Sequence, residues 1–367
     1  MRPIVEPIAA LNPAQSERAA RNIALPGFGE DAQRRLANAR VLVLGAGGLG
    51  SPVLQYLAAA GVGVIGIVDF DTVDLSNLQR QVIHRSADVD EPKTASAARA
   101  IHELDPAITV NEHPITLTRD NALELMRGYD LVIDGSDNFA TRYLANDAAA
   151  ILRLPYVWGS VLRFDGQVTV FWEGAPFGRS LDYRDLHPVP PAPGDVLSCA
   201  EAGVLGSVCA TIGAMMATEA VKLITGVGEP LLGRVQTLDA LAASWTEFEL
   251  RRHPARIPVA ELIDYEVFCG VPKVDQAFEI EDRLQGALLI DVREPHEHQR
   301  RHLDDDVLIP LADLLADLSS AGPGPVVVYC ATGIRSGRAA EALRASGVEA
   351  YSLRGGIAGF MQRLRTS

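Results

Sequence analysis

A glycine-rich turn is the first feature of this sequence whose residue types and spacing could do chemistry. The turn GAGGLG, residues 45–50, lies between two apolar runs, 41–44 and 52–60. Glycines let the backbone turn tightly and approach a phosphate, and the helix expected behind the turn offers free N–H groups. Asp69 ends the next apolar run, where a carboxylate can hold a ribose hydroxyl. The pattern predicts a nucleotide site, and by itself it favours NAD.

Charged residues beyond the turn favour a nucleoside triphosphate over a dinucleotide. Arg80 and Lys93 add two cations near a site that already has a helix N-terminus. A dinucleotide pyrophosphate does not require them, whereas a triphosphate whose pyrophosphate must leave does. Asp137 and Asn138 follow a third apolar run, where a carboxylate can hold Mg²⁺ against phosphate oxygens. Alternatively, Asp137 and Asn138 cap a helix, and either cation is a solvated surface charge.

A cysteine at the start of a loop is the second chemical feature. Cys330 follows a predicted strand, 326–329, and precedes a predicted helix, 338–345. Backbone N–H groups in such a loop point inward at the sulfur, and the helix N-terminus adds partial positive charge. These groups favour a thiolate, and they would hold a persulfide anion in the same way. The proposed persulfide loop consists of Cys330, Ala331, Thr332, Gly333, Ile334 and Arg335.

The spacing between Cys330 and Arg335 separates two classes of enzyme. Four residues lie between them, one fewer than in the phosphate loop of cysteine phosphatases. This shorter spacing resembles the rhodanese sulfurtransferases, as do LIDVREP at 289–295 and LRGG at 353–356. The resemblance covers roughly residues 275–367. Sulfur transfer is therefore favoured over a phosphatase, and an inert structural thiol is the remaining alternative.

Alternating strands and helices supply the framework that must position these residues. The runs 41–44, 64–68 and 131–133 are expected to be buried strands, and 94–104 and 122–126 helices. Such alternation predicts an α/β fold with a parallel sheet and helices on both faces. Periodicity fades after residue 250, and the alternation then restarts on a smaller scale. The predicted division is a larger domain at 1–250, a connection at 251–274 and a smaller domain at 275–367.

The composition limits the partners and the surroundings. A formal net charge of −14 without a long Lys/Arg run argues against a nucleic-acid partner. The first residues lack the apolar core of a secretory signal. The apolar stretch 204–224 contains Glu219 and Lys222, so we expect a buried helix rather than a membrane span. Four scattered cysteines show no disulfide framework, which with these features predicts a cytoplasmic protein.

Six separated motifs resemble the adenylyltransferases related to ubiquitin-activating enzyme, of the MoeB/ThiF type. In order they are GAGGLGSPV, DFDTVDLSNLQRQ, EPK, DGSDNFATRYLAND, PYVWGS and SCAEAGVLG, within about residues 15–250. The resemblance implies a Rossmann-like ATP-binding domain with a mixed sheet, joined to a small α/β rhodanese domain. It also implies that Asp137 holds Mg²⁺. The candidate ATP-binding residues are Gly45, Gly47, Gly48, Asp69, Asp71, Ser76, Asn77, Leu78, Gln79, Arg80, Lys93, Asp137 and Asn138.

The same resemblance implies a homodimer and a peptide substrate. The family uses an arginine from the N-terminal helix of the partner subunit, and Arg21 in ERAARNIALPGFG matches it. A ubiquitin-like sulfur-carrier protein would insert its C-terminal tail, ending in Gly-Gly. Its carboxylate would attack the α-phosphate of ATP and give an acyl-adenylate and pyrophosphate. Since that carboxylate is already ionised, catalysis would be alignment plus charge stabilisation by Mg²⁺, Arg21, Arg80 and Lys93.

Fusion of the two domains supplies a role for Cys330. Adenylation makes the carboxylate an electrophile, and a persulfide on Cys330 is a strong nucleophile. Attack would give an acyl disulfide, and reduction would release a thiocarboxylate, with sulfur supplied by a cysteine desulfurase or another persulfide donor. Cys199 matches a thiol proposed in relatives as a covalent or reducing group, and a cysteine without essential work is its alternative. Molybdenum-cofactor synthesis is favoured, although thiamine, cysteine and tRNA thiolation routes share the chemistry.

The sequence departs from the family at a metal site. Many relatives hold a structural zinc with two Cys-x-x-Cys pairs, whereas the expected positions here read Asp182 to Asp185 and Ile257 to Ala260. Isoleucine and alanine cannot ligate a metal, and tetrahedral structural zinc needs four donors. We therefore expect no zinc, with the two lobes tied by ordinary packing. We expect packing for Cys209, no role for Cys269, and surface or capping positions for His84 and His187.

Two other classes of function remain open at this point. An NAD-dependent oxidoreductase with a regulatory rhodanese module would explain the glycine turn, but the sequence has no visible proton-donating His or Tyr motif. A non-catalytic scaffold that binds a ubiquitin-like protein would make no catalytic use of Asp137.

Overall fold

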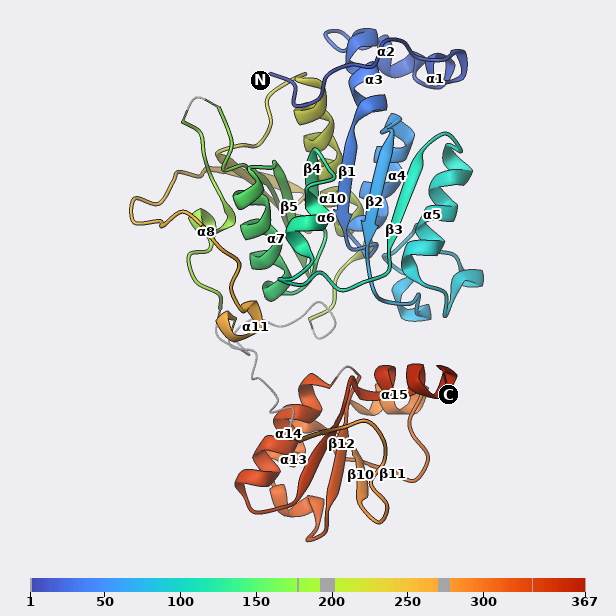
Figure 1. Ribbon diagram of the computed structural model, residues 1–367, viewed down its shortest axis with the longest axis vertical. Helices are drawn as coiled ribbons and strands as arrows, with labels where there is room; N and C mark the ends of the chain where they lie inside the picture. Colours follow the sequence, from blue (N-terminus) through green and yellow to red (C-terminus); the bar gives the residue numbers. More distant parts are fainter. Residues whose placement is uncertain (1, 177, 192–201, 270–277, 332, 367) are drawn as a thin grey trace. The chain divides into compact units, whose positions relative to one another are not determined.

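The computed structural model describes residues 2–366 except 177, 192–201, 270–277 and 332. Contacts within the chain divide it into two compact units, Met1–Gly270 and Val271–Ser367. Each unit has its own sheet flanked by helices, which confirms the predicted α/β class (Figure 1).

The sheet of the first unit is mixed, as predicted. Its eight strands have the order β3-β2-β1-β4-β5-β6-β7-β8. The strands from β3 to β5 pair in parallel, and β6, β7 and β8 continue the sheet in antiparallel pairs. The strands are β1 Arg40–Leu44, β2 Val64–Val68, β3 Thr109–His113, β4 Leu131–Asp134, β5 Tyr156–Leu162, β6 Asp165–Phe171, β7 Arg234–Asp239 and β8 Ser244–Glu249.

The register of the central strands decides where the site lies. Leu44, the last residue of β1, pairs with Val68 of β2 on one side and with Asp134 of β4 on the other. The three strands therefore end at the same level, and the residues that follow them meet at one edge of the sheet. These strands are continuous apolar runs because helices cover both faces of the sheet.

The direction in which the chain crosses between parallel strands decides which face of the sheet each connecting helix covers. The step from β1 through α4 to β2 and the step from β4 through α7 to β5 run in opposite directions along the sheet. Right-handed crossovers then place α4 and α7 on opposite faces. The helices are α1 Pro13–Arg18, α2 Ala20–Ile23, α3 Gly29–Asn38, α4 Gly50–Ala60, α5 Lys93–Leu104, α6 Ala122–Met126, α7 Phe139–Leu152, α8 Tyr183–Leu186, α10 Gly206–Thr225 and α11 Tyr265–Phe268, with 3₁₀ turns at Leu75–Asn77 and Ser86–Asp88.

Helix α10 has the length and apolar composition of a membrane-crossing helix, and no other helix in the described residues does. In the structure it packs against α4, β5 and β6. Glu219 is fully buried in it, pairs with Lys222 and accepts the N–H of Leu231 at 2.7 Å. The helix thus occupies the buried position that the sequence predicts.

A buried ion-pair cluster ties the end of the first unit to its interior. The guanidinium of Arg256 pairs with the carboxylates of Asp182, Asp185 and Glu173, at 3.3 Å for Asp185 and 2.6 Å for Glu173. Asp182 and Asp185 stand where the first Cys-x-x-Cys pair was expected, and Arg256 directly precedes the second position. The sequence analysis expected ordinary packing here. An ionic cluster joins the two segments instead, and the absence of zinc stays a prediction.

The segment after residue 250 belongs to the first unit. The Tyr265 hydroxyl donates to Asp147 at 2.8 Å, and Cys269 is buried. The division into compact units therefore falls between Gly270 and Val271, whereas the sequence placed the whole of 251–274 in the connection. Periodicity fades in this segment because single anchoring side chains, rather than a regular apolar face, hold it.

The second unit has a five-stranded parallel sheet of order β11-β10-β12-β13-β9. Strand β12 matches the predicted strand 326–329, and the helix after Cys330 begins at Ile334 rather than near 338. It begins early because Gly333 adopts φ +103° and turns the chain directly into the helix. The strands are β9 Glu279–Ile280, β10 Leu288–Asp291, β11 Asp306–Leu308, β12 Val326–Tyr329 and β13 Ala350–Leu353, and the helices are α12 Pro295–Arg300, α13 Leu311–Ala316, α14 Ile334–Ala345 and α15 Gly356–Thr366, with a 3₁₀ turn at Leu318–Ala321.

Replacing Arg256 with alanine should destabilise the first unit. Three carboxylates would lose their shared cation, at a cost of about 3–5 kcal/mol for a broken buried ion pair. Trp158, Trp172 and Trp245 are the only tryptophans and all lie in the first unit, so their fluorescence during urea unfolding reports that unit. Arg251→Ala removes only an exposed ion pair and should leave the midpoint unchanged. Equal midpoints for the two variants would contradict the role given to the cluster.

Candidate functional site

A pocket lies at the carboxyl edge of the parallel strands of the first unit. The turn after β1, the end of β2 and the loop after β4 contribute to its lining. Nine predicted residues line it: Gly45, Gly47, Gly48, Asp69, Asp71, Arg80, Lys93, Asp137 and Asn138. Within the described part of the chain, the lining does not include Ser76, Asn77, Leu78 or Gln79, which form the segment leading to Arg80. The structure therefore brings the glycine turn, both cations and Asp137 together.

The glycine turn requires glycine at both ends. Gly45 has φ +88°, and a Cβ on Gly50 would lie 1.9 Å from the carbonyl oxygen of Gly45. Helix α4 begins at Gly50, so a helix N-terminus stands directly behind the turn. The positive end of its dipole suits a phosphate, whereas the N–H groups of Ser51 and Val53 already donate to the carbonyls of Gly47 and Leu49.

Asp69 is fixed by backbone donors on both of its oxygens. The N–H of Ala46 donates to Oδ2 at 2.8 Å, and the N–H of Asp71 donates to Oδ1 at 2.9 Å. Burial raises the pKa of Asp69, and the charge of Lys93 opposes that shift. The carboxylate thus connects the glycine turn to the end of β2, at the place expected for a ribose contact.

The two predicted cations keep donors free for a phosphate. Lys93 is buried, with its side chain 7% exposed, and its Nζ lies 2.9 Å from Oδ2 of Asp71. Arg80 donates to the carbonyl of Ser76 at 3.2 Å. An ammonium has three N–H donors and a guanidinium has five, so each group retains further donors. Burial of Lys93 in the pocket wall excludes the surface-charge alternative for that residue.

Asp137 and Asn138 have different positions. Oδ1 of Asn138 accepts the N–H of Thr141 at 2.8 Å, so Asn138 caps helix α7, which was the alternative interpretation. Asp137 is exposed in the pocket lining. Of this pair, Asp137 is therefore the residue able to reach a metal ion or a phosphate-bound water.

A buried network lies behind Asp137, around the carboxylate of Asp134 at the end of strand β4. Asp134 accepts the N–H of Ser136 at 2.8 Å and the hydroxyl of Tyr156. Burial raises the pKa of Asp134 and, well above its usual value, that of Tyr156. Arg142 lines the pocket and donates to the Ser136 carbonyl at 3.1 Å. Arg142 and Tyr156 stand inside the quoted motifs DGSDNFATRYLAND and PYVWGS, so the signal was present but was not given a role.

The sequence analysis also predicted positions for two histidines and one cysteine, and the structure shows where each of them lies. His84 is buried and lies 2.8 Å from Oγ of Ser96 and 2.9 Å from the Ala46 carbonyl oxygen, so the surface or capping prediction was wrong. Its burial lowers the pKa of His84, so a neutral ring supports the turn. His187 is partly buried and packs on the ring of Tyr183. Cys209 is buried as expected, but it also lines the pocket.

The second candidate site surrounds Cys330 between β12 and α14. Its sulfur is buried, and it accepts the N–H of Gly333 at 3.1 Å and the hydroxyl of Ser336 at 3.5 Å. Helix α14 starts at Ile334, so the sulfur also lies at a helix N-terminus. These donors could hydrogen-bond to a sulfur anion. Ser336 was not singled out in the sequence, and Thr332 lies outside the described residues.

The persulfide loop is held on two sides. Arg335 donates two hydrogen bonds of 2.7 Å to Glu297, which the sequence analysis missed. Burial alone would raise the pKa of Glu297, but these hydrogen bonds lower it. On the other side, the N–H of Ile357 donates to the carbonyl of Cys330 at 2.8 Å. A Cβ on Gly356 would lie 2.3 Å from that carbonyl oxygen, which explains the glycine of the LRGG run.

Of the other two predicted catalytic residues, one is outside the described part of the chain and one lies away from the pocket. Cys199 lies outside the described residues. Arg21 is exposed in helix α2, which lies near the end of the sheet where β1 begins (Figure 1). The preceding helix is anchored there, since Arg18 donates to the Leu104 carbonyl at 2.6 Å. The pocket opens at the other end of the strands, so Arg21 does not reach the pocket of its own chain.

Comparison with known proteins agrees with this geometry. The model of the ThiF family matches residues 19–259. The chain belongs to the ThiF family. A model of the rhodanese-like domain matches residues 276–363. Both resemblances drawn from the sequence motifs are confirmed.

Relatives match over most of the chain. A probable adenylyltransferase/sulfurtransferase MoeZ of Mycobacterium tuberculosis is 49% identical over 385 residues, covering 99% of this chain and 97% of the relative. A sulfur carrier protein adenylyltransferase of Thermus thermophilus is 50% identical over 263 residues, covering 70% and 97%. The crystal structure of E. coli MccB with MccA-N7isoASN has a TM-score of 0.58 at 22% identity, covering 66% of this chain and 75% of that one, and supports the fold alone.

This ThiF-family chain is therefore an enzyme of the adenylyltransferase and sulfurtransferase class. Membership of this class favours a nucleoside triphosphate rather than a dinucleotide as the ligand of Arg80 and Lys93. It gives no support to an NAD-dependent oxidoreductase.

Gly50→Ala should disrupt the pocket, whereas Gly47→Ala should be tolerated by the fold. The new methyl group at position 50 would overlap the Gly45 carbonyl, but the nearest neighbour at position 47 would be 3.7 Å away. Overpacking of this kind costs about 1–3 kcal/mol or more. We expect thermal unfolding followed by tryptophan fluorescence to show a lower midpoint for Gly50→Ala only. Indistinguishable midpoints for the two variants would show that the turn is not constrained as described.

Proposed function

We propose that the first unit adenylates the C-terminal carboxylate of a ubiquitin-like sulfur-carrier protein ending in Gly-Gly. The second unit would then supply sulfur from a persulfide on Cys330. The observation that carries the proposal is the presence of Arg80, Lys93 and Asp137 in one pocket beside a glycine turn. Similarity to a sulfur carrier protein adenylyltransferase supports this class of substrate.

Adenylation needs alignment and charge stabilisation more than proton transfer. The triphosphate of ATP would lie against the turn at 45–50, with Lys93 and Arg80 donating to its oxygens. The carrier carboxylate, already ionised at neutral pH, attacks the α-phosphorus, and the bond to the bridging oxygen of the β-phosphate breaks. The products are the acyl-adenylate and pyrophosphate. The two cations stabilise the negative charge that builds up on the leaving pyrophosphate.

Asp137 is the residue that we assign to Mg²⁺. It is an exposed carboxylate in the pocket lining, and Mg²⁺ prefers carboxylate and phosphate oxygens. The buried contacts of Asp134 and Arg142 hold the loop that presents it. When bound, the ion would neutralise charge on the phosphate oxygens.

Sulfur transfer would use the anion-stabilising loop around Cys330. The outer sulfur of the Cys330 persulfide attacks the acyl carbon, the bond to AMP breaks, and an acyl disulfide forms. A second thiol then attacks the inner sulfur, which releases the carrier as a thiocarboxylate and leaves a disulfide on the enzyme. Cys199 is our candidate for that thiol, and a cellular dithiol would reduce the disulfide. The N–H of Gly333 and the hydroxyl of Ser336 would stabilise the persulfide anion on Cys330 before it attacks the acyl carbon.

A homodimer would complete the nucleotide site. Arg21 lies in α2, away from the pocket of its own chain, and matches the position from which the family donates an arginine to the partner subunit. An arginine arriving from a second copy would add a third cation to the phosphates. The site would then be shared between two copies.

The remaining features of the proposal rest on resemblance and composition. We favour a carrier of molybdenum-cofactor synthesis, a cytoplasmic setting, and a cysteine desulfurase or another persulfide donor as the source of sulfur. The net charge of −14 also suits a partner with a basic face.

Two single substitutions should separate the two activities. Asp137→Ala should lower carrier-dependent exchange of pyrophosphate into ATP at least about 100-fold, the size of effect seen when an electrostatic group is removed. The same variant should keep thiosulfate:cyanide sulfur transfer, because Cys330 lies in the other unit. Cys330→Ala should show the reverse pattern.

Each variant serves as the control for the other. Mass spectrometry of the carrier should find thiocarboxylate with the unaltered enzyme and with neither variant. Normal thiocarboxylate formation by Cys330→Ala would refute the persulfide assignment. Normal pyrophosphate exchange by Asp137→Ala would refute the role of that carboxylate and favour a scaffold or a different site.

A further inference from the structure

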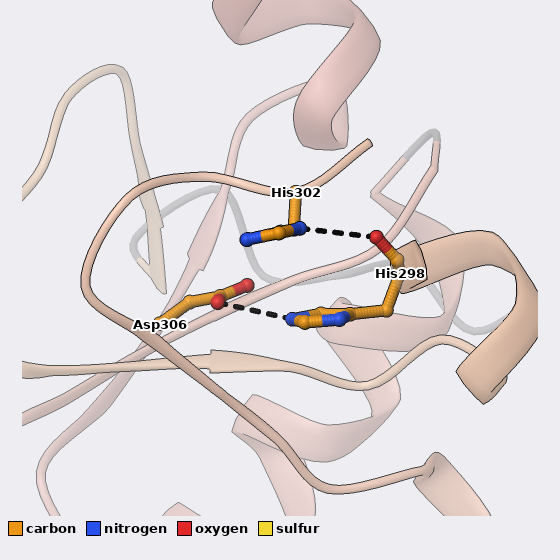
Figure 2. A group of neighbouring side chains, drawn as sticks. All are labelled: His298, His302 and Asp306. Atoms are coloured by element: carbon orange, nitrogen blue, oxygen red, sulfur yellow. Dashed lines mark hydrogen bonds and ion pairs between the residues drawn. The ribbon is translucent and has the colours of Figure 1, made fainter. Parts of the chain in front are cut away.

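A group of two histidines and one aspartate lies in the second unit, apart from the Cys330 sulfur. His298 belongs to helix α12, His302 follows that helix, and Asp306 begins strand β11. Each offers one ligand atom, and the three atoms lie within 4.8 Å of one another. Figure 2 shows both rings and the carboxylate gathered on one side of the loop that joins them.

The hydrogen bonds of His302 leave one of its nitrogens able to accept a metal. Its Nδ1 lies 3.1 Å from the carbonyl oxygen of His298. A carbonyl only accepts, so Nδ1 carries the proton and Nε2 of the neutral ring keeps its lone pair.

Hydrogen bonds with two neighbouring side chains hold the carboxylate of Asp306 in position. One oxygen lies 3.1 Å from Nε2 of His298, and the other accepts the hydroxyl of Tyr329. The Tyr329 hydroxyl in turn accepts the N–H of Leu303 at 3.1 Å. The carboxylate side chain is only 3% exposed, so its position is set by the fold rather than by solvent. A buried, oriented carboxylate next to two imidazoles is a metal ligand set with outer contacts already in place.

The distances require one ring to move. Ligand atoms in a tetrahedral site with bonds of about 2.0–2.1 Å lie about 3.3 Å apart, and the 3.1 Å between His298 and Asp306 already fits. The rings of His298 and His302 are stacked, with centroids 4.2 Å apart and planes at 10°, so His302 must turn to point its nitrogen inward. His302 is exposed, so its ring has room to turn, and the turn exchanges its hydrogen bond to the His298 carbonyl for the bond to the metal.

We propose that His298, His302 and Asp306 bind a divalent transition-metal ion, for which Zn²⁺ is the natural probe. Two imidazoles and one carboxylate suit Zn²⁺ and other first-row transition-metal ions rather than Mg²⁺ or Ca²⁺, which prefer oxygen ligands. The ion takes the place of the proton between His298 and Asp306, and exposure of His302 leaves a fourth position for water. This site is unrelated to the four-cysteine zinc that the sequence was predicted to lack.

The site is connected to the persulfide loop through the chain. Glu297, the neighbour of His298, accepts both hydrogen bonds from Arg335, and Tyr329 directly precedes Cys330. An ion that fixes helix α12 to β11 therefore also fixes the residue that clamps Arg335. Binding should stabilise the second unit, because any ion that binds only the folded form shifts the folding equilibrium.

Calorimetric titration of the metal-free full chain with Zn²⁺ tests the proposal. To remove the cysteine of the second unit as a competing ligand, the titration uses a Cys330→Ala background. We expect one site that His302→Asn weakens at least about tenfold, the lower end of losses seen when metal-site contacts are removed. His253→Asn replaces an exposed histidine of the first unit and should leave the titration unchanged.

Cobalt spectroscopy gives a second and independent measurement. Co²⁺ bound by nitrogen and oxygen should show visible ligand-field bands without the sulfur-to-metal charge transfer of a thiolate site, and His302→Asn should lose those bands. Asp306→Asn provides a further variant in case one substitution impairs folding, which far-ultraviolet circular dichroism would reveal. Equal zinc affinity in His302→Asn and the unaltered background, or cobalt bands dominated by sulfur, would overturn the proposal. Neither result depends on carrier adenylation.

Discussion

The close passage of the backbone between Gly45 and Gly50 is the constraint on which the nucleotide pocket depends. With no Cβ in the way, helix α4 can begin directly behind strand β1, and its N-terminus faces the space where a phosphate would lie. The common level at which β1, β2 and β4 end then brings Asp69 and the 135–138 loop to the same edge. Lys93 joins them through Asp71, so a cation, two acids and a helix end share one small volume.

Both units contain an arrangement that suits an anion, although the anions proposed for them differ. In each, a strand leads through a loop directly into the N-terminus of a helix: the turn at 45–50 in the first unit and the Cys330 loop in the second. The first adds side-chain cations, which a polyphosphate needs. The second adds the N–H of Gly333 and the hydroxyl of Ser336, which suit a single sulfur anion. A chain with a net charge of −14 can therefore still bind anions, because the donors are local and fixed.

The bounds of several strands and the chemistry of the Cys330 loop could be predicted from the sequence. The contacts that residues distant in the sequence make with these elements could not. The apolar runs gave β2 and β12 with their observed bounds, and the spacing around Cys330 gave its loop. Glu297 lies 38 residues before Arg335, and nothing in its local pattern marks it as a partner. The Arg256 cluster was missed for the same reason, since it joins residues 74 positions apart. His84 was misjudged because a polar residue outside an apolar stripe gives no sign that it lies beneath a turn.

A crystal structure of the chain with a non-hydrolysable ATP analogue tests the central claim most directly. The account predicts that the triphosphate lies against the 45–50 turn and that Nζ of Lys93 leaves Asp71 for a phosphate oxygen, at a hydrogen-bond distance of about 3 Å. Phosphates bound elsewhere, with Lys93 still paired only to Asp71, would contradict it.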